Sequence, residues 1–325
     1  MDSSTLSLHP IKSLFVFGTL NVINSLFSRI VITKFFFDYP IVISLFNMAL
    51  LLSLIEFARI TKLLKVQAYT FYRGKTMFVP SFFFCLSHYI SLHCFDGISL
   101  PFFPFFEKFI PILVVIFYLL FLRKEHPSII TLAILVFICF GSALASVFEV
   151  SFDLLGLIYS FGALAMQSAS LVLMEKVRTQ MDMSVIELIY LNTFNCLCLF
   201  LIADIVQDEL RDAYSYFQTN TTTTFYVCFF IMIITGSFVH SMLIYCVATT
   251  NTLNTTIAQN CSSSIQTFIA YLLSIEVFYD SSPTFTTFFG IIITIVATIL
   301  YLVSSKDKQL KPFGKIKYNA IVQHE

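Results

Sequence analysis

Two ionisable residues, Glu107 and Lys108, stand side by side inside a long apolar stretch at residues 100–122. If that stretch is a helix, Lys108 lies about eight residues from its start, roughly 12 Å into a hydrocarbon core about 30 Å thick. A lysine at that depth costs several kcal/mol unless it faces a watery cavity or a partner. An ion pair with Glu107 is one alternative, but adjacent residues of a helix do not face each other. We therefore expect Lys108 and Glu107 to line a cavity for an anionic molecule, such as one that carries phosphate.

A second polar cluster lies in the apolar stretch at 252–274. The candidate binding residues in it are Asn260, Ser262, Ser263 and Ser264. So many hydrogen-bonding side chains on one span do not all face lipid. Tight helix–helix packing is the alternative role for small hydroxyl residues. We expect this cluster to meet Lys108 at the substrate site.

Aromatic and amide side chains mark two further stretches. Tyr190 and Asn192 lie in the stretch at 184–204, and His240 and Tyr245 lie in the stretch at 225–248. Tyrosine and asparagine suit recognition of a ring by stacking and amide hydrogen bonds, although a tyrosine at a membrane boundary is often an interfacial anchor. A histidine there either carries protons or is a hydrogen-bonded packing residue.

The composition is that of an integral membrane protein. Hydrophobic residues make up 58% of the 325 residues, charged residues make up 12%, and the mean hydropathy is +0.86. A membrane helix needs about 20 apolar residues. We expect an all-α protein with ten transmembrane helices, placed near 13–36, 39–58, 77–95, 100–122, 128–148, 154–174, 184–204, 225–248, 252–274 and 283–304.

Two segments of the chain share one apolar pattern. At a shift of about 156 residues, Phe109–Val147 aligns with Ile265–Val303. The turn inside the first copy is basic, from Arg123 to His126, and the turn inside the second is acidic, with Asp280. Basic turns stay in the cytoplasm, so the copies are expected to have opposite orientations. This predicts two inverted five-helix repeats, 13–148 and 154–304, as in alternating-access transporters, and it places Ser263-Ser264 opposite Glu107-Lys108.

The distribution of charge predicts the orientation. Most of the 19 lysine and arginine residues fall on the side that holds the N-terminal segment 1–12 and the C-terminal tail 305–325, while acidic residues gather on the other side. The excess of lysine and arginine marks the cytoplasmic side. Both termini are therefore expected in the cytoplasm.

Several classes of function are not indicated. The sequence has no Walker A motif, no HExxH and no GxSxG, and its eight cysteines lie mostly in apolar stretches without metal-ligand spacing. We expect no enzyme activity, cofactor, metal or nucleic-acid partner. Asn220-Thr221-Thr222 is a glycosylation sequon on the non-cytoplasmic side.

The chain resembles the nucleotide-sugar transporters, solute carrier family 35, of the drug/metabolite transporter superfamily. It is closest in pattern to members that carry UDP-glucuronate, UDP-N-acetylglucosamine or UDP-N-acetylgalactosamine. The resemblance covers residues 13–304 and rests on the order and spacing of four stretches. These are Leu100-Pro101 to Arg123-Lys124, Phe152 to Gly156, Tyr190 to Asn192, and Ile244-Tyr245 to Ile257.

The resemblance implies an antiporter of the Golgi or endoplasmic reticulum membrane, which imports a cytosolic nucleotide sugar and returns a nucleoside monophosphate. By the same resemblance Tyr190 and Asn192 bind the base, and the segment from Asn260 to Ser264 binds the phosphate and sugar. Relatives usually carry a lysine in that segment, whereas this chain has Cys261 followed by three serines. GDP-mannose is thereby disfavoured, and a UDP-sugar is the expected substrate.

The expected partners are the nucleotide sugar, the nucleoside monophosphate and the lipid bilayer, with a homodimer as a further option. Two alternatives stay open. One is a carrier for sugar phosphates or other small organic anions, and the other is a membrane scaffold that does not transport.

Overall fold

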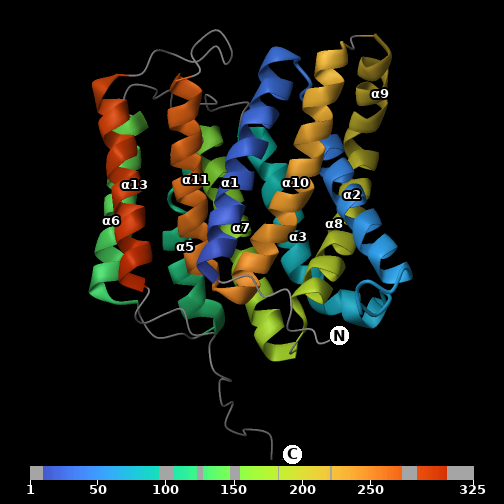
Figure 1. The fold of residues 1–325 in the computed structure, drawn as a ribbon, viewed down its shortest axis with the longest axis horizontal. Coiled ribbons are helices and arrows are strands. Elements are labelled where there is room, and N and C mark those ends of the chain that lie inside the picture. The colour runs from blue at the N-terminus through green and yellow to red at the C-terminus, as the bar shows by residue number, and fades with distance from the viewer. Residues whose placement is uncertain are drawn as a thin grey trace, which may run out of the picture.

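The computed structural model describes residues 10–94, 106–122, 127–146, 154–181, 183–219, 222–272 and 284–305. All regular elements in these ranges are helices (Figure 1). They are α1 (Pro10–Arg29), η1 (Ile30–Lys34), α2 (Pro40–Ile60), α3 (Phe71–Cys94), α5 (Ile110–Phe117), η2 (Tyr118–Leu122), α6 (Ile129–Ser146), α7 (Leu154–Met181), α8 (Val185–Gln207), α9 (Glu209–Thr219), α10 (Thr223–Thr249), α11 (Thr252–Leu272) and α13 (Phe285–Ser305).

The helices confirm an all-α membrane protein. Six stretches are long and apolar enough to cross a membrane, and two shorter apolar helices, Ile110–Leu122 and Ile129–Ala145, accompany them. Polar residues keep the mean hydropathy of α11 below that limit. The count of ten transmembrane helices stays a prediction.

Two segments between the expected spans are partly helical. α3 begins at Phe71, several residues inside the stretch expected to be a polar loop, and the segment after α8 folds into the short helix α9. α9 is amphipathic, so averaging its hydropathy hides it. Asp208, between α8 and α9, has φ of 57°, a left-handed conformation that Asp and Asn adopt more easily than most residues.

Local sequence signals set other helix ends. At the start of α8, the Ser184 hydroxyl accepts from the Glu187 backbone N–H at 3.3 Å, and the Glu187 carboxylate accepts from the Ser184 N–H at 3.3 Å. This reciprocal pair satisfies two backbone donors that a helix start leaves unpaired. Pro40 opens α2 at a position where its missing N–H costs nothing.

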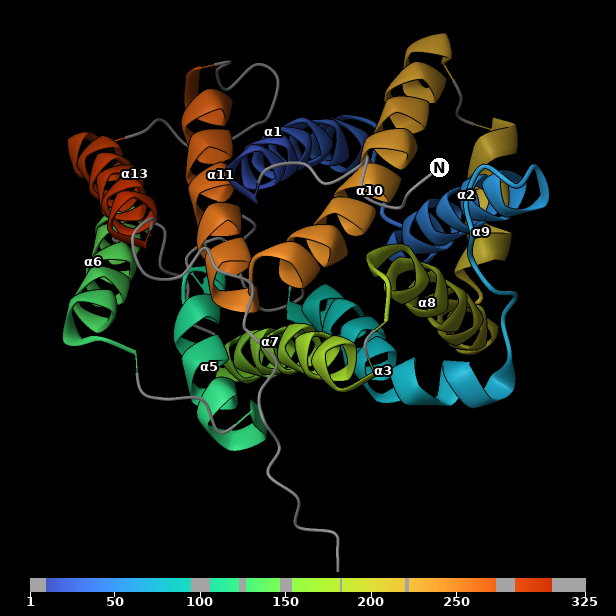
Figure 2. The same ribbon diagram turned by 60° about the horizontal axis from the view of Figure 1, so that its bottom comes forward.

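Helices from the first part of the chain pack mainly against helices from the second part. α1 packs on α10 and α11, while α7 packs on α3 and α5. Likewise α2 packs on α10, and α8 packs on α3. The pairs α2–α8 and α6–α13 lie side by side, as Figures 1 and 2 both show. These are the pairings that a two-fold relation between inverted halves produces, and the boundaries of the halves stay a prediction.

The pair α6–α13 is unusually close at two glycines. A Cβ added at Gly290 would lie 2.4 Å from the Gly141 carbonyl oxygen and 2.5 Å from the Ala145 nitrogen. Glycine at both positions therefore lets the two backbones touch, as small residues do in membrane helix pairs.

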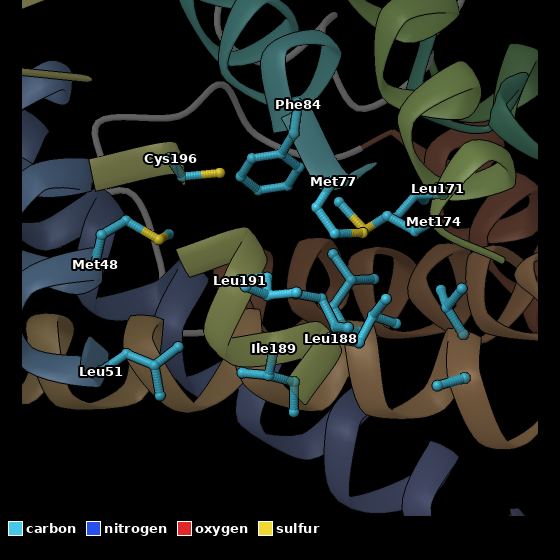
Figure 3. Close-up of a cluster of buried hydrophobic side chains, with 14 of the residues drawn as sticks. Met48, Leu51, Met77, Phe84, Leu171, Met174, Leu188, Ile189, Leu191 and Cys196 are labelled. Carbon is cyan, nitrogen blue, oxygen red and sulfur yellow. The ribbon is translucent and has the colours of Figure 1, made fainter. Parts of the chain in front are cut away.

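The largest apolar core lies where α2, α3, α7, α8 and α10 meet. Figure 3 shows part of it, with Met77, Phe84, Met174, Leu188 and Leu191 turned toward one another. A separate aromatic cluster joins α9 to the start of α10. At its centre Phe37 is fully buried and lies 5.2 Å from the ring of Tyr216 and 5.5 Å from the ring of Phe225.

The described charged residues are unevenly distributed between the two ends of the bundle, with an excess of basic residues at one end and of acidic residues at the other. The lower edge of Figure 1 holds the start of α1 and the ends of α2, α7 and α13. Around that edge stand the basic residues Lys12, Arg59, Lys62, Lys65, Arg73, Lys75, Lys176 and Arg178. The opposite end, around α9, carries the acidic residues Asp38, Asp204, Asp208, Glu209 and Asp212.

Candidate functional site

Lys108 lies at an interruption in a helix. Phe106 and Glu107 are helical, Lys108 and Phe109 form a turn, and α5 starts at Ile110 with Pro111 in its first turn. Pro111 has no N–H to donate to the Glu107 carbonyl one turn earlier, and its ring crowds that carbonyl, which accounts for a break at this place. Interrupted helices inside a membrane expose backbone groups and are a common way to build a binding site in transporters.

The side chain of Lys108 is 5% exposed and is held by α11. Its Nζ donates to the Asn260 carbonyl oxygen at 2.6 Å and to the Ser264 hydroxyl at 3.0 Å. In return the Asn260 amide donates to the Lys108 carbonyl oxygen at 3.3 Å. An ammonium group has three N–H donors, so these two acceptors leave one N–H of Lys108 for a further partner. In the described part of the chain, no carboxylate forms an ion pair with Lys108.

Glu107 also turns toward α11. The Ser263 hydroxyl donates to the Glu107 carboxylate at 3.4 Å. This bond and the one between Lys108 and Ser264 each join residues 156 positions apart, which is the shift of the repeat. The contact of Glu107-Lys108 with Ser263-Ser264, which the repeat predicts, is therefore present.

Ser262 faces a different neighbour. Its hydroxyl accepts from the Asn21 amide of α1 at 2.8 Å. Ser262 lines a mostly apolar groove of about 500 Å³ between α1, α11 and α13. Gly18 of α1 also lines this groove. Ser262 therefore lies on another side of α11 than the residues that hold Lys108.

Tyr190 and Asn192 contact other helices. The Tyr190 hydroxyl donates to the Glu56 carboxylate of α2 and accepts from the Tyr69 N–H at 3.3 Å. Asn192 is fully buried, and its amide lies 2.8 Å from the Ser81 hydroxyl and 3.2 Å from His240 Nε2. These bonds run to α2, α3 and α10, whereas Lys108 bonds to α11.

Tyr245 is half-buried on α10. It packs against the large apolar core with Val239 and Met242 of the same helix. The structure therefore brings Glu107 and Lys108 together with Asn260, Ser263 and Ser264. It does not bring Tyr190, Asn192, Tyr245 or Ser262 into hydrogen-bond contact with them. A substrate-binding role for any of these residues stays a prediction.

A comparison with known protein families identifies the class of protein. The sequence model of the Triose-phosphate Transporter family matches residues 11–302. The chain belongs to this family. It is therefore a membrane solute transporter of the drug/metabolite superfamily.

Solved structures support the fold of the transporter. One, described only as "Crystal structure of protein", has a TM-score of 0.62 at 9% sequence identity, over 91% of this chain and 98% of that one. At that identity the likeness concerns the fold. No curated protein sequence matches the chain significantly.

The structure has a buried acidic residue, Glu175, at the basic end of the transporter, and the sequence did not predict its role. Glu175 of α7 is 6% exposed, and its Oε2 accepts from the Tyr118 hydroxyl at 2.7 Å. The same oxygen accepts from the Thr252 N–H at 2.9 Å and from the Thr252 hydroxyl at 2.6 Å. The Tyr118 oxygen accepts from the Leu253 N–H at 3.1 Å. Glu175 precedes Lys176, and an acidic residue at the basic end of a span is a signal that a count of lysine and arginine residues does not include.

Two more polar contacts join helices at the same end. Arg73 of α3 pairs with Glu187 of α8 at 2.8 Å, and Tyr190 of α8 bonds to Glu56 of α2. Each contact joins a helix from before residue 148 to a helix from after residue 154. No cluster of three metal-ligating side chains occurs in the described ranges.

Proposed function

We propose that this transporter exchanges a cytosolic nucleotide sugar, most suitably a UDP-sugar, for a nucleoside monophosphate across the Golgi or endoplasmic reticulum membrane. The single observation that carries the proposal is the buried ammonium of Lys108 at a helix interruption. It is bound by two neutral oxygens of α11, and none of the carboxylates in the described ranges forms an ion pair with it. A buried cation with neutral partners favours an anionic group of a substrate.

The proposed binding step is a substitution of partners at Lys108. A diphosphate that approaches the interruption replaces the Asn260 carbonyl and the Ser264 hydroxyl as acceptors for Nζ. Ser264 already donates to the Asn260 carbonyl at 3.0 Å, so this acceptor keeps a donor when Lys108 leaves. The Ser263 hydroxyl then donates to the phosphate or the sugar, and the Ser264 oxygen accepts from a hydroxyl of the sugar.

The proposed transport cycle is a rocking of the two halves about Lys108. α1 packs on α10 as α7 packs on α3, so the two halves contact each other in equivalent ways. This equivalence supports an inward-facing and an outward-facing arrangement of similar energy. An empty carrier keeps a buried charge and reorients slowly. Obligatory exchange follows from that cost.

Uptake into liposomes tests the proposal. We expect uptake of one UDP-sugar that depends on UMP inside the vesicles and disappears in Lys108→Gln. Lys176→Gln, at the cytoplasmic end of α7, is the matched control and keeps uptake. Uptake that is equal in Lys108→Gln and the native chain would disprove the role of Lys108.

A carrier for phosphorylated sugars is the second candidate function. The name of the family, Triose-phosphate Transporter, favours it. The bonds that hold the Asn192 amide at Ser81 and His240, and not at Lys108, favour it as well. Competition separates the two candidates. A sugar phosphate that blocks UDP-sugar uptake and is itself exchanged for phosphate would favour this second function, and no uptake of any kind would favour a scaffold.

The proposed orientation places the basic end of the bundle in the cytoplasm. The described lysines and arginines at the ends of α2 and α7, and at the start of α1, support it by the excess of positive charge on cytoplasmic loops. Both termini are then cytoplasmic, and α9 faces the lumen.

A further inference from the structure

Glu175 joins three elements at the basic end of the transporter. It belongs to α7, and its carboxylate binds Tyr118 of η2 and the first residue of α11. Taking a carboxylate out of water is costly unless donors surround it. Three donors converge on one oxygen of Glu175, so the centre holds together as a unit.

This centre crosses between the two proposed halves. Tyr118 comes from before residue 148, while Glu175 and Thr252 come from after residue 154. Its bonds therefore have to break when the halves separate at this end. The neighbouring pair Arg73 and Glu187 also crosses, but both of its side chains are about one-fifth exposed and are better screened by water.

The centre is mechanically connected to the Lys108 site through α11. Thr252 is the first residue of α11, and Asn260 follows it by two turns, about 12 Å along the same helix. A helix of this length moves as a rigid element. A shift of Asn260 and Ser264 at the site therefore displaces Thr252 and Leu253 at the end of the helix.

We infer that Glu175 is a positioning residue of the exchanger, which holds the start of α11 against Tyr118 and keeps the cytoplasmic end closed until substrate replaces Asn260 and Ser264 as partners of Lys108. The inference rests on the proposed function. It explains why an empty carrier stays closed, since substrate at Lys108 frees α11 from one of its polar attachments.

The chain offers a closely matched pair of variants. Tyr118→Phe removes a hydroxyl that bonds across the proposed halves. Tyr301→Phe removes a hydroxyl that donates to the Asn254 side chain at 2.8 Å within the second half. Both tyrosines are buried, and both hydroxyls bond at the cytoplasmic end of α11. Glu175→Gln is a further variant, which keeps the shape of the side chain and removes its charge.

The first test measures separation of the halves without substrate. Spin labels are attached through non-canonical amino acids at Leu120 of η2 and Met181 of α7, which are both exposed, in the full chain in lipid nanodiscs. We expect a longer or broader distance distribution in Tyr118→Phe and Glu175→Gln, and an unchanged one in Tyr301→Phe. The same distribution in all four proteins would overturn the inference, whatever their transport activity.

The second test measures leak. Proteoliposomes loaded with labelled UMP are placed in buffer with and without the UDP-sugar. We expect efflux without external sugar to rise several-fold in Tyr118→Phe, whereas Tyr301→Phe requires the sugar as the native chain does. Equal leak in the two variants would overturn a role in coupling. If the native chain does not exchange while its distances respond to Tyr118→Phe, then the proposed function fails and the closure stands.

Discussion

At the scale of single residues, the sequence pointed to the correct neighbours of Lys108. The depth of an isolated lysine in an apolar stretch, together with the shift of the repeat, predicted its contact with Ser264. What the sequence did not predict is the backbone partner, the Asn260 carbonyl at 2.6 Å. Side-chain types carry no signal for a bond to a main-chain oxygen.

The amide of Asn192 illustrates the limit of reasoning from residue type. The resemblance implies that it binds a nucleobase, which stays a prediction, and in the structure it lies between Ser81 and His240 in the helix contact of α3, α8 and α10. An asparagine inside a membrane serves either purpose, and the choice depends on the helix that faces it. Packing of distant helices decides this, and no local pattern in the sequence reveals it.

A structural role for Asn192 predicts a loss of stability. Asn192→Ala leaves Ser81 and His240 without this partner in a buried place, which costs about 1–3 kcal/mol. We expect a lower midpoint of thermal unfolding in detergent, measured by near-ultraviolet circular dichroism. An unchanged midpoint with weaker substrate binding would instead show that Asn192 contacts the substrate.

At the scale of helices, spans with strong apolar runs were predictable within several residues, and amphipathic or polar-rich ones were less so. α8 occupies 185–207 against an expected 184–204, because its capping box and apolar run are both local signals. α9 lies between the expected spans 184–204 and 225–248, where no helix was predicted. Its apolar residues Ala213 and Phe217 pack on aromatic rings contributed by other elements. That partner surface exists only in the folded protein.

The close contact of α6 with α13 predicts a strong steric effect. In Gly290→Ala the added methyl group meets backbone atoms at 2.4 and 2.5 Å, so the helices have to move apart. Overpacking of this kind costs about 1–3 kcal/mol. We expect a lower thermal midpoint and poorer recovery of monodisperse protein.

Gly162→Ala is the matched control for this prediction. The added methyl group there lies 3.9 Å from the Ile90 Cγ2 methyl, which is an ordinary van der Waals contact. Its midpoint should stay the same or rise slightly, since alanine favours helix over glycine. Equal losses in both variants would contradict the close packing of α6 and α13.

At the scale of the whole molecule, the described part of the chain has an excess of basic residues at one end of the bundle and of acidic residues at the other, as the sequence predicted. The pairing of early helices with late ones is what the predicted inverted repeats would produce, and the repeats themselves stay a prediction. Both features are summed over many residues, so errors at single helix boundaries do not remove them. The polar closure at Glu175 was out of reach of the sequence because its partners come from 57 and 77 positions away.

The orientation of the molecule gives a prediction that does not depend on substrate. In sealed microsomes a membrane-impermeant maleimide should label Leu63→Cys, in the exposed turn after α2, from the cytosolic side. Tyr214→Cys, exposed on α9, should be labelled after permeabilisation. The native chain gives the background from its own thiols. The reverse pattern would invert the proposed orientation.

The central claim is that the buried ammonium of Lys108 binds the phosphate of an exchanged substrate. Its most direct test is counter-transport by the purified protein in liposomes, with UDP-, GDP- and CMP-sugars outside and UMP, GMP, CMP or no nucleotide inside. The account predicts uptake of one UDP-sugar that needs internal UMP, is lost in Lys108→Gln and is retained in Lys176→Gln. Equal uptake in the native chain and Lys108→Gln, or uptake that is indifferent to the internal nucleotide, would contradict it.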